Sequence, residues 1–131
     1  MKYKILVVDD EKDLAETIKD QIEIFFTEDI NVDLAFNGLD GADILNSQKY
    51  DLIITDYKMP RMNGAEMIQS IRAEQSAPSY KTPIILITGF VADLKRNESL
   101  PADITFLEKP YNIQEFTETI RKNLFYQKVY L

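Results

Sequence analysis

Leu52-Ile53-Ile54-Thr55-Asp56-Tyr57-Lys58-Met59-Pro60 is the stretch that decides the fold. A short continuous apolar run that ends in turn residues predicts a strand over residues 52–55 that is buried on both faces. Asp56 then lies where this strand leaves the sheet, in the crevice where open α/β sheets bind ligands. A carboxylate in that place is held rigidly and still meets water, so it can bind a metal or attack an electrophile.

The composition restricts the chemistry that is open to the chain. It has 131 residues, enough for one domain with a sizeable core. The net charge of −7 argues against direct binding of nucleic acid, which needs a basic surface. The chain has no cysteine and no histidine, which removes disulfides, thiolate nucleophiles and the commonest general base and zinc ligand. Carboxylates, lysine, hydroxyl groups or a bound ion must therefore carry any reaction.

The organisation along the chain is that of a single unit, and we treat residues 1–131 as one domain. The first apolar run, residues 5–8, ends at Asp9 and Asp10. It is too short for a signal peptide or a membrane span, so we expect a cytoplasmic protein with no membrane contact. We find no internal repeat and no flexible linker.

The apolar pattern predicts five strands that alternate with five helices. The strands are expected at residues 5–8, 31–36, 52–55, 83–88 and 104–107. The helices are expected at residues 13–26, 39–46, 65–74, 89–99 and 112–124, the first with an apolar stripe of Leu14, Ile18, Ile22 and Phe25 or Phe26, and the last with Asn112 as its N-cap. Asn37-Gly38 and Asn63-Gly64 are turn signals. Residues 89–99 have few large apolar side chains, so we expect this helix to be the most mobile.

Such alternation predicts βαβ units, a parallel sheet and right-handed crossovers, which is a doubly wound α/β fold. The runs at 5–8, 52–55 and 83–88 are apolar throughout and belong in the middle of the sheet. The alternating strand 31–36 and the short strand 104–107 belong at the edges. The strand order 2-1-3-4-5 satisfies this, and it brings the carboxyl ends of 5–8 and 52–55 side by side.

Polar residues follow four of these strands and should meet in one crevice. They are Asp9, Asp10 and Glu11 after the first strand, Asp56 after the third, Thr88 and Gly89 after the fourth, and Lys109 after the fifth. Crowded carboxylates repel one another, and oxygen ligands without histidine or cysteine favour Mg²⁺, with Mn²⁺ as the alternative. Lys109 and Thr88 are donors that a phosphoryl group needs, and Gly89 allows a close approach of the backbone. The residues therefore indicate phosphoryl chemistry on an aspartate.

The chain resembles the receiver domain of two-component response regulators over residues 3–126, with residues 127–131 as a tail. The segments that carry the resemblance are Ile5-Leu6-Val7-Val8-Asp9-Asp10, Asp56-Tyr57-Lys58-Met59-Pro60-Arg61-Met62-Asn63-Gly64, Ile87-Thr88-Gly89 and Phe106-Leu107-Glu108-Lys109-Pro110. Each is weak alone, but together and in this order they are specific. The resemblance implies a flavodoxin-like fold of the CheY type.

The resemblance also implies a role for individual residues. Asp56 would be the phosphoacceptor. Asp10 would bind Mg²⁺ directly, Asp9 largely through water, and the backbone carbonyl of Lys58 would be a further ligand. Thr88 and Lys109 would contact phosphoryl oxygens. Phe106 takes the place of an aromatic switch residue that rotates inward when Thr88 moves, and as phenylalanine it has no hydroxyl to offer a partner.

As a member of this family, the chain would be a signalling phosphoacceptor and not a conventional enzyme. It would accept a phosphoryl group from phosphohistidine on a histidine kinase or phosphotransfer protein. It would also phosphorylate itself from small phosphodonors and lose the phosphate slowly. Output would pass through residues 89–99, 104–107 and the last helix to a target or output domain, or to a homodimer. Because it lacks histidine, the chain cannot be the phosphohistidine donor.

Lys58 and Phe90 each follow a site residue by two positions and flank the expected phosphoryl position. In this family, residues at such positions tune how fast the phosphate is lost. We hypothesise that Lys58 and Phe90 limit the access of water and slow hydrolysis.

Several of these residues also have an ordinary structural explanation. Asp9 and Asp10 would suit a helix N-terminus, Thr88 an N-cap and Lys109 a solvated surface position. Arg61 would steer a phosphodonor or simply be solvated. The apolar residues at 124–126 and 129–131 would extend the last helix, begin a linker or form a dimer contact.

Two other classes of protein compete with this assignment. A phosphatase that forms an aspartyl-phosphate would carry Asp-x-Asp after the first strand and a cap insertion, whereas this chain has Asp9-Asp10 and no insertion. A pseudo-receiver would be an interaction module that never turns over phosphate, and the complete acidic set argues against it. The kinase, the target, the pathway and the presence of an output domain are not encoded in these motifs.

Overall fold

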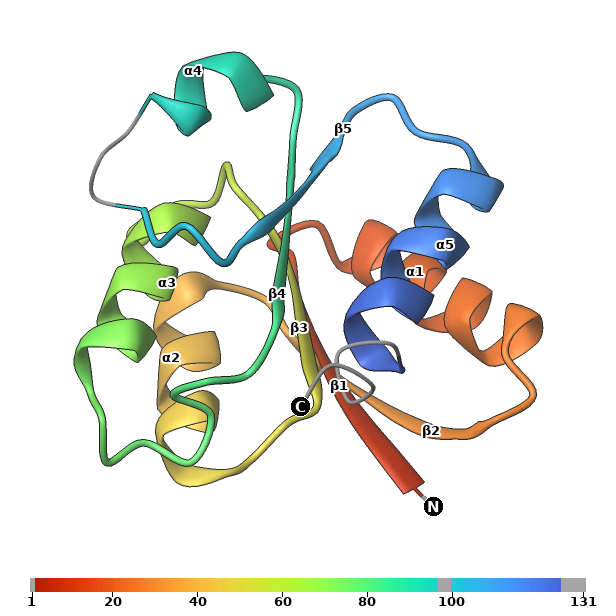
Figure 1. Ribbon diagram of the computed structural model, residues 1–131, viewed down its shortest axis with the longest axis horizontal. Coiled ribbons are helices and arrows are strands. Elements are labelled where there is room, and N and C mark those ends of the chain that lie inside the picture. The colour runs from red at the N-terminus through yellow and green to blue at the C-terminus, as the bar shows by residue number, and fades with distance from the viewer. Residues whose placement is uncertain (1, 97–99, 126–131) are drawn as a thin grey trace.

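A computed structural model describes residues 2–96 and 100–125 of the chain. Five strands alternate with five helices along the chain (Figure 1). The strands are β1 Lys2–Val8, β2 Asp29–Ala35, β3 Leu52–Asp56, β4 Ile84–Thr88 and β5 Thr105–Glu108. The helices are α1 Lys12–Phe25, α2 Gly38–Ser47, α3 Gly64–Ala73, α4 Val91–Lys95 and α5 Ile113–Leu124. The predicted alternation is confirmed.

All strands pair in parallel and the sheet order is β2-β1-β3-β4-β5, as predicted. Every residue of β3 and β4 is buried, because helices cover both faces of these central strands. In the register, Val8 pairs with Thr55, and Asp56 pairs with Ile87. The carboxyl ends of β1, β3 and β4 therefore end at the same edge of the sheet.

Two apolar cores lie on the two faces of the sheet. One contains the inward residues of α1 and α5, among them Ile18, Ile22, Phe116 and Ile120. The other contains residues of α2 and α3, among them Leu45, Met67, Ile68 and Ile71. In Figure 1, α1 and α5 lie on the right of the sheet and α2 and α3 on the left. This is the doubly wound arrangement that the alternation predicts.

Asparagine side chains begin three of the helices. Asn37, Asn63 and Asn112 each accept a hydrogen bond from the backbone N–H three residues on, which satisfies a donor that the first helical turn leaves unpaired. At Asn63 the bond is reciprocal, because the Glu66 side chain accepts from the Asn63 N–H at 3.0 Å. Asn37-Gly38 and Asn63-Gly64, predicted as turns, are thus helix starts.

Some predicted details differ from the structure. Leu14, expected in the buried stripe of α1, is 44% exposed because it lines an open cavity beyond the end of the sheet. Phe26 is buried, whereas Phe25 is 48% exposed. Helix α4 is shorter than residues 89–99 within the described chain, since Gly89 and Phe90 precede it and residues 97–99 lie outside. The tail 127–131 also lies outside the described residues.

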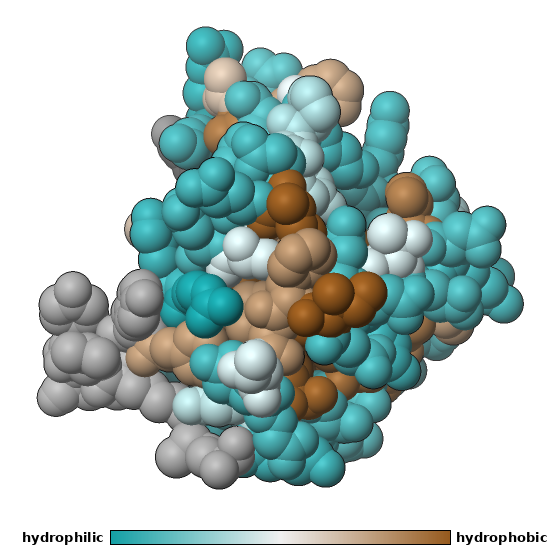
Figure 2. All heavy atoms as spheres, turned by 90° about the vertical axis from the view of Figure 1, so that its right-hand side faces the viewer, coloured by the Kyte–Doolittle hydropathy of each residue, from teal (hydrophilic) through white to brown (hydrophobic). Residues whose placement is uncertain are grey.

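The face formed by α1 and α5 carries exposed apolar side chains among hydrophilic ones (Figure 2). They include Leu14 and Ile24 of α1 and Ile113 of α5.

Over residues 2–96 and 100–125, no helix combines the length and the apolar character that crossing a membrane would require.

Candidate functional site

Three carboxylates meet at the carboxyl edge of the sheet. Each of Asp9, Asp10 and Asp56 offers an oxygen, and these three oxygens all lie within 4.8 Å of one another. Asp9 and Asp10 directly follow β1, and Asp56 ends β3. Asp9 and Asp56 are only 5% and 9% exposed, whereas Asp10 is exposed. The expected convergence of these loops is therefore present.

Lys109 supplies the positive charge of this cluster. Its Nζ lies 2.7 Å from Oδ1 of Asp56. The Lys109 N–H donates to the Thr88 carbonyl at 2.9 Å, which continues the pairing of β4 and β5 beyond the strand ends, and the following peptide bond to Pro110 is cis. Partial burial lowers the pKa of Lys109, but the hydrogen bond and charge of Asp56, with the charge of Asp9, outweigh it and raise that pKa. Lys109 is therefore a charged partner of the cluster.

Asp9 is a buried carboxylate of this cluster, and its pKa is raised. Burial raises its pKa to about 6, and the negative charges of Asp56 and Asp10 act in the same direction. A hydrogen bond from the Glu11 N–H to Oδ1 at 3.0 Å and the charge of Lys109 oppose this rise only in part. The three carboxylates carry more negative charge than the ion-paired Lys109 balances, and a hard divalent cation fits the remaining charge.

The loop after β3 is held tightly against the site. The Gly64 N–H donates to the Tyr57 carbonyl at 2.8 Å, and a Cβ at Gly64 would lie 2.5 Å from the Asp56 carbonyl oxygen. Between them Arg61 has a positive φ of 69°, and the Met62 N–H donates to the Pro60 carbonyl at 2.8 Å, which closes a γ-turn. The loop needs glycine at position 64 because no side chain fits there.

Thr88, Gly89 and Phe90, at and just after the end of β4, differ in burial and in their contacts. Thr88 is buried, and its Oγ1 accepts a hydrogen bond from the Phe90 N–H at 3.0 Å. A Cβ at Gly89 would meet no heavy atom within 4 Å, so the described protein itself does not require glycine there. Phe90 is 54% exposed, and the Lys58 ammonium lies 5.8 Å from its ring centroid. Lys58, which lines the cleft at Asp56, and Phe90 are therefore within the range of a cation–π interaction.

Phe106 lies on β5, away from the carboxylates. It is half-buried and packs at the margin of the core that α2 and α3 form. The Lys95 ammonium of α4 lies 5.9 Å from its ring centroid. Its backbone pairs with Leu86 of β4, two residues before Thr88. The sheet thus connects the position of Phe106 to that of Thr88.

Two clefts lead to Asp56. One has a volume of about 510 Å³ and is lined by Asp10, Glu11, Asp56, Lys58, Met59, Pro60 and Lys109. The other, of about 530 Å³, opens between α1 and the segment before α5 and has a largely apolar wall that includes Leu14, Ile18, Ile87, Pro110 and Tyr111. Since Asp56 is 9% exposed and lines both clefts, each of them offers a reactant a route to its carboxylate.

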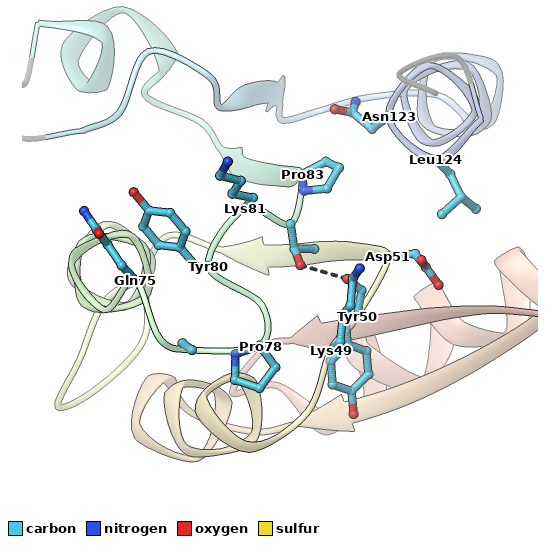
Figure 3. Close-up of a pocket in the computed structure, with 12 residues that line it drawn as sticks. Lys49, Tyr50, Asp51, Gln75, Pro78, Tyr80, Lys81, Pro83, Asn123 and Leu124 are labelled. Atoms are coloured by element: carbon cyan, nitrogen blue, oxygen red, sulfur yellow. Dashed lines mark hydrogen bonds between the residues drawn. The ribbon is translucent and has the colours of Figure 1, made fainter. Parts of the chain in front are cut away.

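A third hollow, of about 480 Å³, lies near the amino ends of β3 and β4 (Figure 3). Its buried polar groups are bonded within the protein. The Thr82 hydroxyl donates to the Tyr50 carbonyl at 2.8 Å, and the Asn123 amide donates to the Thr119 carbonyl at 2.8 Å. The hollow is thus accounted for by the packing of the 75–82 loop against β3 and α5.

Sequence patterns did not indicate every residue that forms the site. Leu14 and Tyr111 line the apolar cleft, although each looks like an ordinary member of an amphipathic segment. Gly38 contacts the loop after β3, and the sequence showed it only as part of a turn signal. The glycine itself was the available sign, since a glycine at the first position of a helix invites a search for a close neighbour.

Comparisons with known proteins agree with this geometry. The family model described as the response regulator receiver domain matches residues 5–121. The response regulator ArlR of Staphylococcus aureus is 38% identical over 120 residues, which cover 90% of this chain and 51% of ArlR. The chain thus spans about half the length of the curated relatives it matches.

Solved structures show the same fold. The receiver domain of the Francisella response regulator 1452 superimposes with a TM-score of 0.77 at 29% identity, over 97% of this chain and 98% of that one. The chemotaxis response regulator CheY4 of Vibrio cholerae gives 0.78 at 26% identity, over 95% of this chain and 100% of that one. The chain therefore belongs to the receiver domains of two-component response regulators.

Proposed function

We propose that Asp56 is the phosphoacceptor of this receiver domain. The observation that carries the proposal is the pairing of Asp56 with Lys109 at 2.7 Å beside two further carboxylates. In the reaction, an Asp56 oxygen attacks the phosphorus of a phosphohistidine in line. A phosphorus–oxygen bond forms while the phosphorus–nitrogen bond breaks, and the electron pair stays on the imidazole nitrogen. Lys109 then balances charge on the phosphoryl oxygens.

We propose that Mg²⁺ binds at the acidic cluster, with Mn²⁺ as the alternative. Asp9, Asp10 and Asp56 would hold it, together with the backbone carbonyl of Lys58. The fit rests on the oxygen-only donor set and on the grouping of three carboxylate oxygens within 4.8 Å of one another beside a single ion-paired lysine, Lys109. When bound, the metal supplies charge neutralisation for the incoming phosphoryl group.

The switch that follows phosphorylation would begin at Thr88. The Thr88 hydroxyl would donate to a phosphoryl oxygen, and the movement of Thr88 toward that oxygen would alter the hydrogen bond that its Oγ1 accepts from the Phe90 N–H. That movement would shift the start of the α4 segment and permit Phe106 to turn inward, away from Lys95. The output surface would be α4, β5 and α5, read by a target, by an output domain or by a second copy in a homodimer.

The partner that delivers the phosphoryl group would be a histidine kinase or a histidine phosphotransfer protein. The cleft between α1 and the segment before α5 reaches Asp56 and has an apolar wall, which suits the approach of a protein surface. We place this exchange in the cytoplasm and assign the domain no direct contact with nucleic acid or membrane. Self-phosphorylation from small donors and slow loss of the phosphate would accompany it.

Labelling with phosphoramidate tests the assignment of Asp56. With Mg²⁺ we expect stoichiometric modification that peptide mapping places on Asp56, and we expect EDTA to abolish it. Asp56→Asn should remain unmodified, whereas Asp51→Asn, a matched change at the other end of β3, should be modified like the wild type. A label on Asp9 would favour an aspartyl-phosphate phosphatase, and no Mg²⁺-dependent label would favour a pseudo-receiver.

A further inference from the structure

Gly38, the first residue of α2, touches the loop that carries the site. It is buried, and a Cβ at this position would lie 2.4 Å from the carbonyl oxygen of Met62 and 3.0 Å from its Cβ and Cγ. A real Cβ essentially never approaches a heavy atom within 3.0 Å, so a larger residue must move the Met62 backbone and the start of α2 apart by about half an ångström or more. Backbone yields less readily than the end of a flexible side chain.

The loop that Gly38 touches is closed on itself. The Met62 N–H is bonded to the Pro60 carbonyl, and the Gly64 N–H to the Tyr57 carbonyl, each at 2.8 Å. Tyr57 is in turn tied to β4, because its N–H donates to the Ile87 carbonyl at 3.0 Å. Because these bonds tie the loop together, a displacement of the Met62 backbone should also move the backbone of residues 58–60.

Those residues form one wall of the cleft at Asp56. Lys58, Met59 and Pro60 line it together with Asp10 and Glu11. Met59 is buried and anchors the loop in the core, so the loop moves as a unit and not by a side-chain adjustment alone. The resemblance to receiver domains assigns the backbone carbonyl of Lys58, in this wall, to the proposed metal.

We infer that Gly38 is a positioning residue for the metal site: it lets α2 approach closely enough to hold the 57–64 loop, and with it the Lys58 carbonyl, in place. The inference rests on the proposed function, since it needs Mg²⁺ to bind at this cluster. Mg²⁺ demands near-ideal octahedral geometry with ligands at about 2.0–2.1 Å, so a carbonyl displaced by half an ångström is a poor ligand. Outer residues that orient ligands typically affect metal affinity by about 10-fold to 100-fold.

The chain offers a matched control in the same helix. A Cβ at Gly41 would meet the Met67 sulfur at 2.8 Å and the Val8 methyl carbons at 3.1 and 3.3 Å, and none of these atoms belongs to the 57–64 loop. Gly38→Ala and Gly41→Ala therefore make the same chemical change in α2 and both crowd a neighbour, but only the first crowds the loop.

The experiment measures Mg²⁺ affinity by titration of the metal alone, together with backbone amide chemical shifts of residues 57–64 in EDTA. We expect Gly38→Ala to weaken Mg²⁺ binding by about tenfold. It should also shift the loop amides in the absence of metal. Gly41→Ala should keep its Mg²⁺ affinity within about twofold of the wild type, whatever its stability. If Gly38→Ala does not fold, Met62→Ala removes the Met62 Cγ that packs against Gly38 and keeps the carbonyl and Cβ, and it should weaken binding in the same direction.

Three results would decide against the idea or its premise. Wild-type affinity and wild-type loop shifts in folded Gly38→Ala would refute the role of Gly38. Equal weakening by Gly38→Ala and Gly41→Ala would show a general packing effect and would refute it as well. Failure of the wild-type protein to bind Mg²⁺ would instead refute the proposed function.

Discussion

Lys109 and Asp56 are joined by an ion pair of 2.7 Å between Nζ and Oδ1, although 53 positions separate them in the sequence. The pair forms because β3 and β5 both flank β4, so their carboxyl ends open at the same edge of the sheet. The Asp56 side chain is 10% exposed and that of Lys109 45%, so the carboxylate is the more buried partner of the pair. This relationship organises the site before any ligand arrives.

Removal of the lysine should separate metal binding from phosphorylation. In Lys109→Met the cluster loses its competing cation, so we expect Mg²⁺ affinity to rise by roughly threefold to tenfold. Phosphorylation from phosphoramidate should slow by tenfold or more, on the order of one lost charge-stabilising donor. Mg²⁺ titration and labelling kinetics measure the two effects. Lys81→Met makes the same charge change far from the cluster and should alter neither.

The buried carboxylate of Asp9 should make stability depend on pH. Its pKa is about 6 in the folded protein and near 3.8 when unfolded, so the folded state binds the proton more tightly. In EDTA, the contribution of Asp9 should therefore raise the free energy of unfolding as pH falls from 7.5 to 4.5. Asp9→Asn should stabilise the protein at pH 7.5 by roughly 1–3 kcal/mol.

Urea unfolding at pH 7.5 and 5.0 measures this prediction. The advantage of Asp9→Asn should shrink at the lower pH, and Mg²⁺ should reduce it, because the wild type binds the metal more tightly and gains more stability from it. Glu16→Gln removes an exposed charge from α1 and should show neither trend. An advantage that is independent of pH would contradict a raised pKa at Asp9.

Arg72 should stabilise the fold mainly through its hydrogen bonds to backbone carbonyls and less through its ion pair with Asp103. Its Nη1 and Nη2 donate to the carbonyls of Tyr80 and Thr82, each at 2.7 Å, and so fasten the chain before β4 to α3. Arg72→Met keeps the apolar stem but leaves both carbonyls without this partner, so we expect a loss of about 2 kcal/mol in urea unfolding.

The ion pair of Arg72 with Asp103 provides the comparison. It measures 3.3 Å, and the Asp103 side chain is 62% exposed. Asp103→Asn should therefore cost under about 1 kcal/mol. If the two variants lose equal stability, the carbonyl contacts are not the main contribution.

Lys58 and Phe90 should slow the loss of phosphate as a pair. The Lys58 ammonium lies 5.8 Å from the Phe90 ring centroid, so each side chain helps to hold the other in place. We expect Lys58→Ala and Phe90→Ala each to shorten the phosphate half-life by roughly twofold to fivefold, and the double variant to fall short of the product of the two effects. Decay of phosphorylated protein in a chase experiment measures this.

Ile24→Ala is the control for that measurement, because Ile24 is 75% exposed on α1 and has no part in the site. An unchanged half-life in both single variants would end the hypothesis. If the double variant shortens the half-life by the full product of the two single effects, Lys58 and Phe90 act independently and their mutual contact has no role.

The sequence alone determined the order and type of the elements, because periodicity depends on neighbouring residues. The apolar runs at β1, β3 and β4, set between amphipathic helices, were sufficient to predict the 2-1-3-4-5 sheet. Since parallel strands end at one edge, the same pattern predicted that Asp9, Asp10, Asp56 and Lys109 would meet. The resemblance then supplied roles that the residues alone leave open.

Only the tertiary structure decided how closely those parts approach. Three examples are the space at Gly38, where a Cβ would lie 2.4 Å from the Met62 carbonyl oxygen, the hydrogen bonds from Arg72 to the chain before β4, and the exposure of Leu14. Each depends on how segments far apart in the sequence pack together. None of them leaves a periodic pattern in the sequence, because each depends on small differences in distance that are set by the packing of whole helices on the sheet. The chain thus encodes its topology locally and its site geometry through long-range contact.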